Sequence, residues 1–278
     1  MKRSDTFSLK SFCLALLMLL CFVAAPTFAK TYSDNSDGTV TDPATGLTWM
    51  RCSVGQTGSS CSGTAISYTW SQAMALTGTV SFAGQNDWRL PNIRELASMI
   101  DLSVSPFFDR LVTFPNTPAS NYWSTTVYAS YTGYAWYGDF SIGNVLAGDK
   151  LSGAKVRLVR GGQSLGLLDV ARPTSDYVDN LDGTVTHTPT GLMWKRCAEG
   201  QTWSGTTCTG SASGFTWDAG KLLTSTFAGQ SDWRMPTEDE LLSLVDFTKD
   251  NSSGTTPAIN ATALPATPST WFWSATPS

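Results

Sequence analysis

A repeat at an offset of 145 residues is the feature that most constrains the fold of this chain. Residues 34–41 read Asp-Asn-Ser-Asp-Gly-Thr-Val-Thr and recur at 179–186 with Leu in place of Ser. Residues 82–91 recur at 227–236 with two changes. Matches of this length indicate two copies of one unit of about 130 residues, which is enough for each to enclose a hydrophobic core.

The second copy stops before the first one does. Residues 122–126 match residues 272–276, and the counterparts of residues 129–160 are missing from a sequence that reaches Ser278. We therefore expect uncovered apolar surface around Trp194 and Trp233, and an open sheet edge. Three explanations of the shorter second copy stay open. The gene record is incomplete, another chain donates the missing strands, or the second copy is only marginally stable.

Residues 1–29 have the pattern of a secretory signal peptide. Basic side chains at Lys2, Arg3 and Lys10 precede an apolar run at 12–23, and small residues precede a cut after Ala29. The run is shorter than the ~20 residues that span a bilayer. We expect an exported protein of the periplasm or the cell exterior, without membrane contact after cleavage.

The charge of the chain argues against nucleic-acid partners. The formal net charge of the 278 residues is −4, and the leader contributes three basic side chains and one acidic one, or +2. The rest therefore carries about −6, and no run of basic residues occurs in it. Binding to nucleic acid, or to a membrane surface by charge, needs the opposite pattern.

The sequence predicts an α+β fold of two tandem modules, each with two short helices and an antiparallel sheet. The predicted domains are residues 31–162, a Gly-, Pro- and Ser-containing linker at 163–176, and the truncated copy at 177–278. In the first copy we expect a hairpin over 38–51 and helices over 70–76 and 92–100. Strands at 134–141, 145–150 and 155–160 should form a meander with a tight turn at Gly143-Asn144.

Two short motifs have plain structural interpretations. Asn92 with Glu95, and Thr237 with Glu240, are predicted capping boxes at helix starts. In the motif at 87–91 we expect a core Trp and an Arg paired with a carboxylate.

The four cysteines outside the leader are expected to form disulfides within each copy. Their positions are Cys52, Cys61, Cys197 and Cys208. Each pair closes a loop of about ten residues, and an even number of cysteines is typical of an oxidising compartment. A four-cysteine zinc site is the alternative, but the Cys-x-x-Cys spacing of such sites is absent.

No cofactor, metal or catalytic group is indicated by the sequence. Residues 34–38 resemble part of a calcium loop, yet Ser33 and Ala44 occupy the positions of its end ligands, which favours an Asx-type turn. The one histidine is His187, and the matching residue of the first copy is Asp42. No nucleophile–base pair or phosphate loop recurs in the copies. Asp and Glu are plentiful enough for the catalytic carboxylate pair of a glycosidase, but no sequence feature singles out such a pair.

Aromatic residues are the better functional lead. Matched tryptophans are expected in the cores, at 49 and 194, 70 and 217, 88 and 233, and 123 and 273. We predict a ligand contact at aromatics outside this set: Tyr131, Tyr134, Trp136, Tyr137 and Trp203. Trp203 lies in a polar loop and should be exposed. Such side chains suit stacking on sugars, and equally suit a protein contact.

Several motifs in a fixed order resemble the Lcl C-terminal domain family, named for the end domain of a bacterial collagen-like adhesin. They are the D-N-x-D-G-T-V-T opening, F-x-G-x-x-D-W-R-L-P-x-x-x-E-L, the block at 122–125 and the V-R-L-V-R segment at 156–160. The resemblance implies a fold similar to C-type lectins and formylglycine-generating enzymes. Fold alone does not fix function.

The resemblance implies a binding role rather than an enzymatic one. The chain lacks the collagen repeat of the namesake, the active-site cysteines of the enzyme branch and the E-P-N or Q-P-D sugar motif of lectins. The namesake is associated with sulfated polysaccharides, which the acidic charge here does not favour. We therefore expect a non-enzymatic binding protein for an extracellular polysaccharide or a surface protein, with the complete first copy as the binding module. The alternatives are a secreted enzyme of the formylglycine-generating branch, or an incomplete gene product without an independent role.

Overall fold

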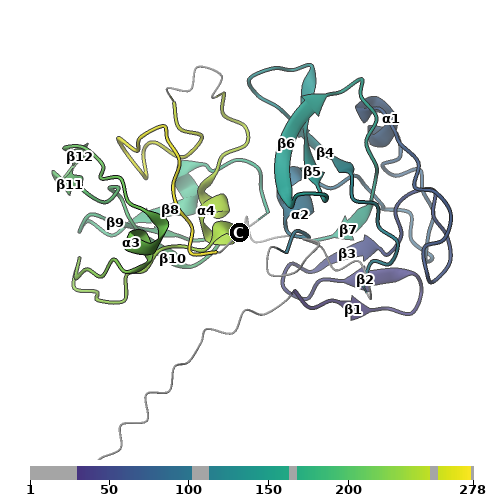
Figure 1. Cartoon of the computed structure of the whole chain (residues 1–278), viewed down its shortest axis with the longest axis horizontal. Helices are drawn as coiled ribbons and strands as arrows, with labels where there is room; N and C mark the ends of the chain where they lie inside the picture. Colours follow the sequence, from purple (N-terminus) through teal and green to yellow (C-terminus); the bar gives the residue numbers. More distant parts are fainter. Residues whose placement is uncertain (1–29, 102–112, 163–167, 251–255, 277–278) are drawn as a thin grey trace, which may run out of the picture.

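The computed structural model describes residues 30–101, 113–162, 168–250 and 256–276. It forms two modules that lie side by side in Figure 1, copy 1 (residues 31–162) and copy 2 (residues 177–278). The predicted signal peptide lies outside the described residues. Small antiparallel sheets and a few short helices make up both modules, which confirms the α+β prediction.

No helix in the described ranges has both the length and the apolar character that crossing a membrane requires.

The first sheet of copy 1 contains the predicted hairpin. Its order is β1 (Ser33–Asp34), β2 (Thr39–Thr41), β3 (Leu47–Met50) and β7 (Val159–Gly161), all antiparallel. In β3, Trp49 lies opposite Val40 on one side and Val159 on the other. The sheet therefore joins the two ends of the copy.

The second sheet is a meander with a different membership from the predicted one. It consists of β4 (Asn121–Val127), β5 (Tyr134–Asp139) and β6 (Asn144–Asp149). The predicted third strand at 155–160 is wrong as part of this meander. Residues from Val159 onward pair with β3 instead, because Val159 is fully buried in the apolar cluster around Trp49.

The turn between β5 and β6 is also wider than predicted. Gly143 N donates to Asp139 O at 2.9 Å, so the loop includes residues 140–143 rather than Gly143-Asn144 alone. Phe140 is the reason, because its ring is fully buried and packs at 4.7 Å from the ring of Tyr122. The loop thus contributes a core side chain to copy 1.

Two short helices fill the space beside these sheets. They are α1 (Trp70–Met74) and α2 (Ile93–Ala97), both shorter than predicted. The capping box of α2 is confirmed, since the Asn92 side chain accepts from Glu95 N at 2.9 Å and Glu95 Oε2 accepts from Asn92 N at 2.8 Å. Glu95 also receives two bonds from Arg89, at 2.6 and 2.7 Å, as predicted for this arginine.

The described residues of copy 1 form two apolar clusters, one on each side of the β3–β7 pair. Trp49 belongs to the first, whereas Trp88 and Trp123 belong to the second. All three indole rings are almost completely buried, which confirms the prediction that they are core residues. Buried aromatic side chains of this size dominate the stability of a small domain.

Copy 2 repeats the hairpin and the helices. Its elements are β8 (Tyr177–Asp179), β9 (Thr184–His187), β10 (Leu192–Lys195), β11 (Thr202–Trp203), β12 (Cys208–Thr209), α3 (Trp217–Lys221) and α4 (Glu238–Leu244). The capping box of Thr237 and Glu240 is confirmed. The main sheet has the order β10-β9-β8, so in the described residues β10 has no neighbour in the place that β7 takes beside β3.

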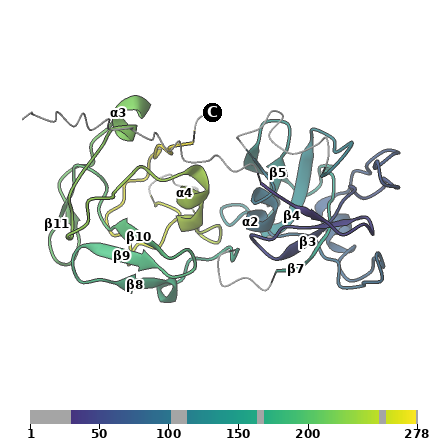
Figure 2. The same cartoon turned by 90° about the horizontal axis from the view of Figure 1, so that it is seen from below.

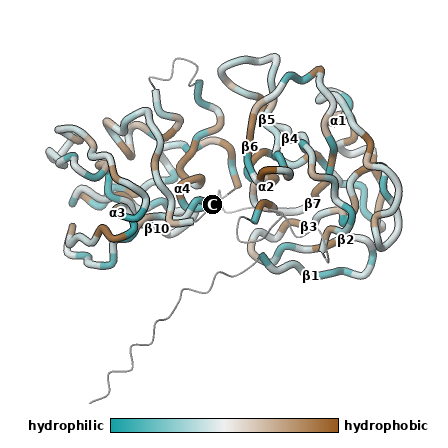
Figure 3. The backbone as a smooth tube through the Cα atoms, viewed as in Figure 1, coloured by the Kyte–Doolittle hydropathy of each residue, from teal (hydrophilic) through white to brown (hydrophobic). Residues whose placement is uncertain are grey.

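The open sheet edge of copy 2 goes with exposed tryptophan side chains, as we expected. Trp273 is 56% exposed, whereas its counterpart Trp123 is 1% exposed. Trp194 and Trp233 are only partly buried, and the described cluster around Val185 is smaller than either cluster of copy 1. Figure 3 shows apolar stretches of the tube at α2 and α4.

The two copies meet at the C-terminal end of α4. Arg94 of copy 1 donates to the carbonyl oxygens of Leu242, at 2.7 Å, and of Val245. The ring of Phe247 lies edge-on to Trp136, with 5.1 Å between the ring centres. In Figure 2, α4 is the element of copy 2 that faces α2 of copy 1.

The segment between the copies is packed where it is described. Residues 163–167 of the predicted linker lie outside the described residues. Leu168 belongs to the first apolar cluster of copy 1, and Thr174–Asp176 form a 3-10 turn. Arg172 is 1% exposed, and its Nε donates to the carbonyl oxygen of Ser243.

We predict that His187 makes the stability of copy 2 fall in mild acid. The ring is fully buried, and burial, aided by the nearby charges of Arg172 and Arg94, lowers its pKa to about 4. The ordinary pKa is 6.5. The unfolded chain therefore binds more protons between pH 6.5 and 4, and the free energy of unfolding decreases as the pH falls through this window, by about 3 kcal/mol at most.

Urea unfolding at pH 7 and pH 4.5 measures this effect. The variant His187→Asn should lose less stability over the interval than the natural chain, because it has no imidazole to protonate. Equal losses in the two proteins would contradict the assignment to His187.

Candidate functional site

Both predicted disulfides are present in the structure. Cys52 is bonded to Cys61, and Cys197 to Cys208, with nine and eleven residues of sequence separation. These four cysteines are therefore unavailable as zinc ligands in this state. Among the described residues, no group of three or more His, Cys, Asp or Glu side chains is arranged to hold a metal ion.

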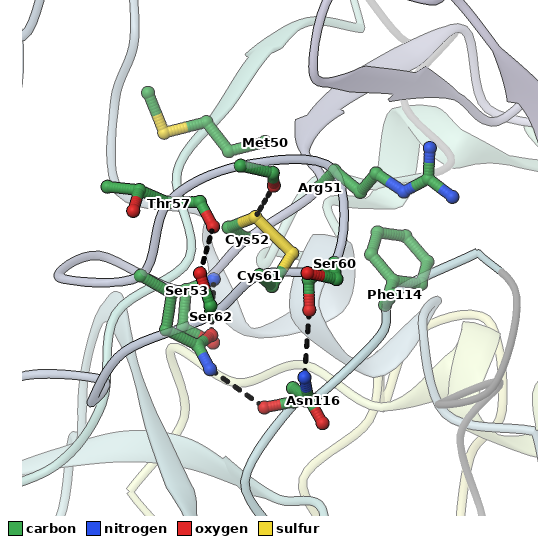
Figure 4. The surroundings of a disulfide bond; sticks show 12 residues. Met50, Arg51, Cys52, Ser53, Thr57, Ser60, Cys61, Ser62, Phe114 and Asn116 are labelled. Carbon is green, nitrogen blue, oxygen red and sulfur yellow. Dashed lines mark hydrogen bonds between the residues drawn. A yellow bond between two sulfur atoms is a disulfide. The ribbon is translucent and has the colours of Figure 1, made fainter.

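The disulfide loop of copy 1 is fastened to the body of its module. Figure 4 shows the amide of Asn116 donating to the carbonyl oxygen of Ser60, at 2.8 Å. The side chain of Gln56 in turn donates to Asn116 O at 2.8 Å. Within the loop, Thr57 and Ser62 exchange two backbone hydrogen bonds. These contacts close the loop against the module.

The disulfide loop of copy 2 lines a cleft of about 360 Å³. This volume is within the range of pockets that bind small ligands. The cleft lies between the loop, the β9–β10 hairpin and the segment after α3. Its lining residues are Asp182, Lys195, Cys197, Ala198, Glu199, Gln201, Thr202, Trp203 and Phe227.

Trp203 is held in place on one wall of this cleft. It lies on β11, opposite Cys208 of β12. The guanidinium of Arg196 lies 4.4 Å from the ring centre, and Arg196 is itself fixed by Asp179 at 2.6 Å. Trp203 is therefore partly buried, where the sequence predicted exposure. The indole is a fixed surface rather than a free side chain.

A charged pair lies beside the aromatic residues. Lys195 Nζ lies 2.7 Å from Glu199 Oε1 and 2.7 Å from Ser225 Oγ. The same ammonium is 5.6 Å from the ring centre of Phe227 and 5.5 Å from that of Trp233, within the range of cation–π contacts. The cleft thus combines aromatic faces with hydrogen-bonding groups of both signs.

Asp182 provides a second carboxylate at the cleft. Its Oδ1 accepts from the hydroxyl of Thr184 at 2.6 Å and from Thr184 N at 2.9 Å. The hydroxyl bond lowers the pKa of this carboxyl below its usual value, so the group is ionised at neutral pH. The matching loop of copy 1 has the predicted Asx turn, since Asp34 Oδ1 accepts from Ser36 N at 2.9 Å.

The cleft arises where copy 2 departs from copy 1. Lys195, Glu199 and Trp203 occupy the positions of Met50, Val54 and Gly58. In copy 1 the first two pack into the second apolar cluster and so close the space. The sequence pattern indicated Trp203 but not the other lining residues Lys195, Glu199, Asp182 and Phe227. The signal that could have found the first two was the change from apolar to charged residues between matched positions.

The aromatic residues predicted in copy 1 do not form one platform. Tyr131 is 61% exposed and lies edge-on to Tyr134, with ring centres 4.9 Å apart. Trp136 contacts Phe247 of copy 2, and Tyr137 packs 6.0 Å from Trp123.

Trp136 and Tyr137 are successive residues of β5, and their side chains therefore point to opposite faces of the sheet. The structure brings Tyr131 and Tyr134 together, and it places Tyr137 on the opposite face of β5 from Tyr134 and Trp136. Trp203, on β11, lies at the far side of copy 2 from this group (Figure 1).

Comparison with known proteins places the chain in a family. The model of the Lcl C-terminal domain matches residues 38–160 and 183–278, one segment in each copy. The chain belongs to the Lcl C-terminal domain family. A search of curated proteins finds no match. The family indicates an adhesin-like surface protein, and paired disulfides are typical of proteins outside the reducing cytosol.

We predict that removal of the Cys197–Cys208 disulfide opens the cleft. The double variant Cys197→Ser, Cys208→Ser should lower the stability of copy 2 by roughly 2–3 kcal/mol, because the bond restricts the unfolded chain. Amide exchange of residues 198–207 should become faster, as the β11–β12 pair loses its cross-link. The control is the double variant Cys52→Ser, Cys61→Ser, which should leave exchange in 198–207 unchanged. Equal exchange of this segment in all three proteins would refute the prediction.

Proposed function

We propose that the protein is an exported, non-enzymatic binding protein of the adhesin type, and that the cleft of copy 2 binds a neutral sugar unit. The observation that carries the proposal is the fixed indole of Trp203 beside the Lys195–Glu199 pair. The ligand class is a polysaccharide or the glycan of a surface protein. Family membership supports a surface role of this kind.

The groups in the cleft match the two kinds of surface that a sugar presents. A pyranose ring has an apolar C–H face, which packs on an aromatic ring, and a rim of hydroxyl groups, which donate and accept hydrogen bonds. Trp203 and Phe227 supply aromatic faces. The carboxylates of the cleft accept hydrogen bonds from sugar hydroxyl groups, and the ammonium donates hydrogen bonds to those groups. The Gln201 amide can do both.

The charge balance favours a neutral ligand over a sulfated one. Lys195 is already paired with Glu199 at 2.7 Å, and Asp182 adds a negative charge nearby. The whole chain is acidic as well. A sulfate group would be repelled by Asp182, and Lys195, the one basic residue among the described residues that line the cleft, is already paired with Glu199.

The chemistry of the cysteines supports binding rather than catalysis. Cys52 and Cys61 are bonded to each other, so neither offers the thiolate that a cysteine-based reaction needs. The pair of exposed Tyr131 and half-buried Tyr134 in copy 1 stays a prediction for a second, weaker ligand contact.

We predict that Trp203→Ala abolishes most of the glycan binding. The chain, freed of residues 1–29, is applied to a glycan array, and affinity for the best ligand is then measured by calorimetry. Loss of the indole should weaken binding about tenfold or more, since aromatic anchors dominate the affinity of such contacts. The variant Glu199→Gln should weaken it less, because the amide still accepts hydrogen bonds.

The matched control is Trp271→Ala, since Trp271 is 98% exposed and does not line the cleft. It should bind as the natural chain does, with an unchanged circular dichroism spectrum. If no glycan is bound, or if both tryptophan variants bind equally well, the proposal fails.

A further inference from the structure

The interface between the copies covers part of an aromatic face of copy 1. Tyr134 and Trp136 are two residues apart in β5, so their side chains share one face of the strand. The ring of Tyr128 lies edge-on to Trp136, with 5.3 Å between the ring centres. The ring of Tyr131 lies edge-on to Tyr134. Phe247 of copy 2 is 4% exposed and lies edge-on to Trp136. Copy 2 therefore covers the Trp136 end of this aromatic group.

Buried polar atoms without partners gather around this interface. In the described part of the chain, nine side-chain nitrogen or oxygen atoms are buried without a hydrogen-bond partner. Four of the nine belong to residues at or beside the interface: Arg94 Nε, Trp136 Nε1, Tyr177 Oη and His187 Nε2. Each such atom gives up its hydrogen bonds to water and gains none in return, which destabilises the closed interface. A change of charge at this place therefore acts on a contact that is already weakened.

His187 lies beside the two arginines that hold the end of α4. It is directly opposite Tyr177 in the β8–β9 pair, with 5.0 Å between the ring centres, and its Nδ1 is 2.8 Å from Thr190 Oγ1. Burial, together with the charges of Arg172 and Arg94, lowers the pKa of the imidazole to about 4. Protonation places a third positive charge beside two buried arginines, and Nε2 then has no acceptor among the described residues.

The turn that contains His187 does not require a histidine. In copy 1 the matching residue is Asp42, whose carboxylate accepts from Ala44 N at 2.9 Å and from the hydroxyl of Thr45 at 2.8 Å. Copy 2 keeps this hydroxyl as Thr190. What the histidine adds to the turn is a group that takes up a proton in mild acid.

A carboxylate near the arginines strengthens this response to acid. Asp176 lies 4.0 Å from Arg172, and burial raises the pKa of its carboxyl above the usual value. Mild acid therefore removes negative charge beside Arg172 while it adds positive charge at His187. The other charged groups near the interface are Asp169, Asp246, and the pair of Lys30 and solvent-exposed Asp239, whose N–O distance is 3.9 Å.

We infer that the interface between the copies opens in mild acid, because protonation of His187 separates the end of α4 from Arg94 and uncovers Trp136. The pKa of His187 is depressed in the closed form, so the closed form is stable above pH 6.5 and loses stability as the pH falls toward 4. If the imidazole regains its ordinary pKa of 6.5 on opening, the equilibrium shifts toward the open form by up to about fiftyfold between pH 7 and pH 4.5. The uncovered Trp136 then extends the contact of Tyr131 and Tyr134, a step that rests on the proposed function.

Small-angle X-ray scattering of the chain freed of residues 1–29 tests the opening without any ligand. We expect a larger radius of gyration at pH 4.5 than at pH 7, with an unchanged far-ultraviolet circular dichroism spectrum. The variant His187→Asp should stay compact at both pH values, because copy 1 forms the same turn with Asp42 and a carboxylate attracts the arginines. His187→Asn, which cannot take up a proton either, should also stay compact. Arg94→Ala should be expanded at both pH values.

Three results would overturn the opening of the interface. The first is an equal radius of gyration of the natural chain at the two pH values. The second is equal expansion of the natural chain and both His187 variants, since another group is then responsible. The third is expansion that occurs only together with loss of the circular dichroism signal, since copy 2 then unfolds instead of separating from copy 1.

A glycan titration tests the consequence for Trp136. In the background of Trp203→Ala, which removes the aromatic anchor of the cleft, the remaining binding should be several-fold stronger at pH 4.5 than at pH 7. Trp136→Ala should abolish this gain, whereas Trp271→Ala should keep it. Remaining binding that does not change with pH contradicts the role of Trp136. Absence of glycan binding by the natural chain contradicts the proposed function, while the scattering experiment decides on the opening separately.

Discussion

The backbone pairing of Val159 holds copy 1 together. This residue lies opposite Trp49 of β3 and exchanges two hydrogen bonds with Arg89, so it joins the hairpin of the first sheet to the segment that leads into α2. The Arg89–Glu95 pair continues the connection to the helix cap. Both apolar clusters lie against the same short segment, with Val159 in one and Leu158 in the other. Copy 2 has the hairpin and the helix cap without the connection in its described residues, and its tryptophans are correspondingly less buried.

The features that the sequence predicted well are those decided by nearby residues. The capping boxes, the hairpins and the disulfide loops each involve partners within about a dozen positions, so the residue types alone determine them. The partner of β7 was misjudged, because Val159 pairs with residues more than a hundred positions away and local pattern carries no information about that distance. The burial of Phe140 widened a turn that sequence spacing alone made tight.

The candidate site was found only in part for a related reason. Trp203 was recognised because an unmatched tryptophan in a polar loop is conspicuous. Lys195 and Glu199 are residue types that are common on any surface. They indicate a cleft only when they are compared with Met50 and Val54, the apolar residues at the matching positions of copy 1. Trp136 and Tyr137 were grouped because they are adjacent in sequence, although adjacency in a strand separates side chains to opposite faces.

Carbonyl oxygens at the end of α4 accept side-chain hydrogen bonds from two arginines that lie outside copy 2. Helix ends leave carbonyl oxygens without partners, and the usual solution is a glycine cap or a local side chain. Here Arg94 and Arg172 donate to the carbonyl oxygens of Leu242, Ser243 and Val245. Arg94 belongs to the copy that is synthesised first. Copy 1 can therefore serve as a preformed template, on which the weaker repeat completes its helix as it follows during synthesis.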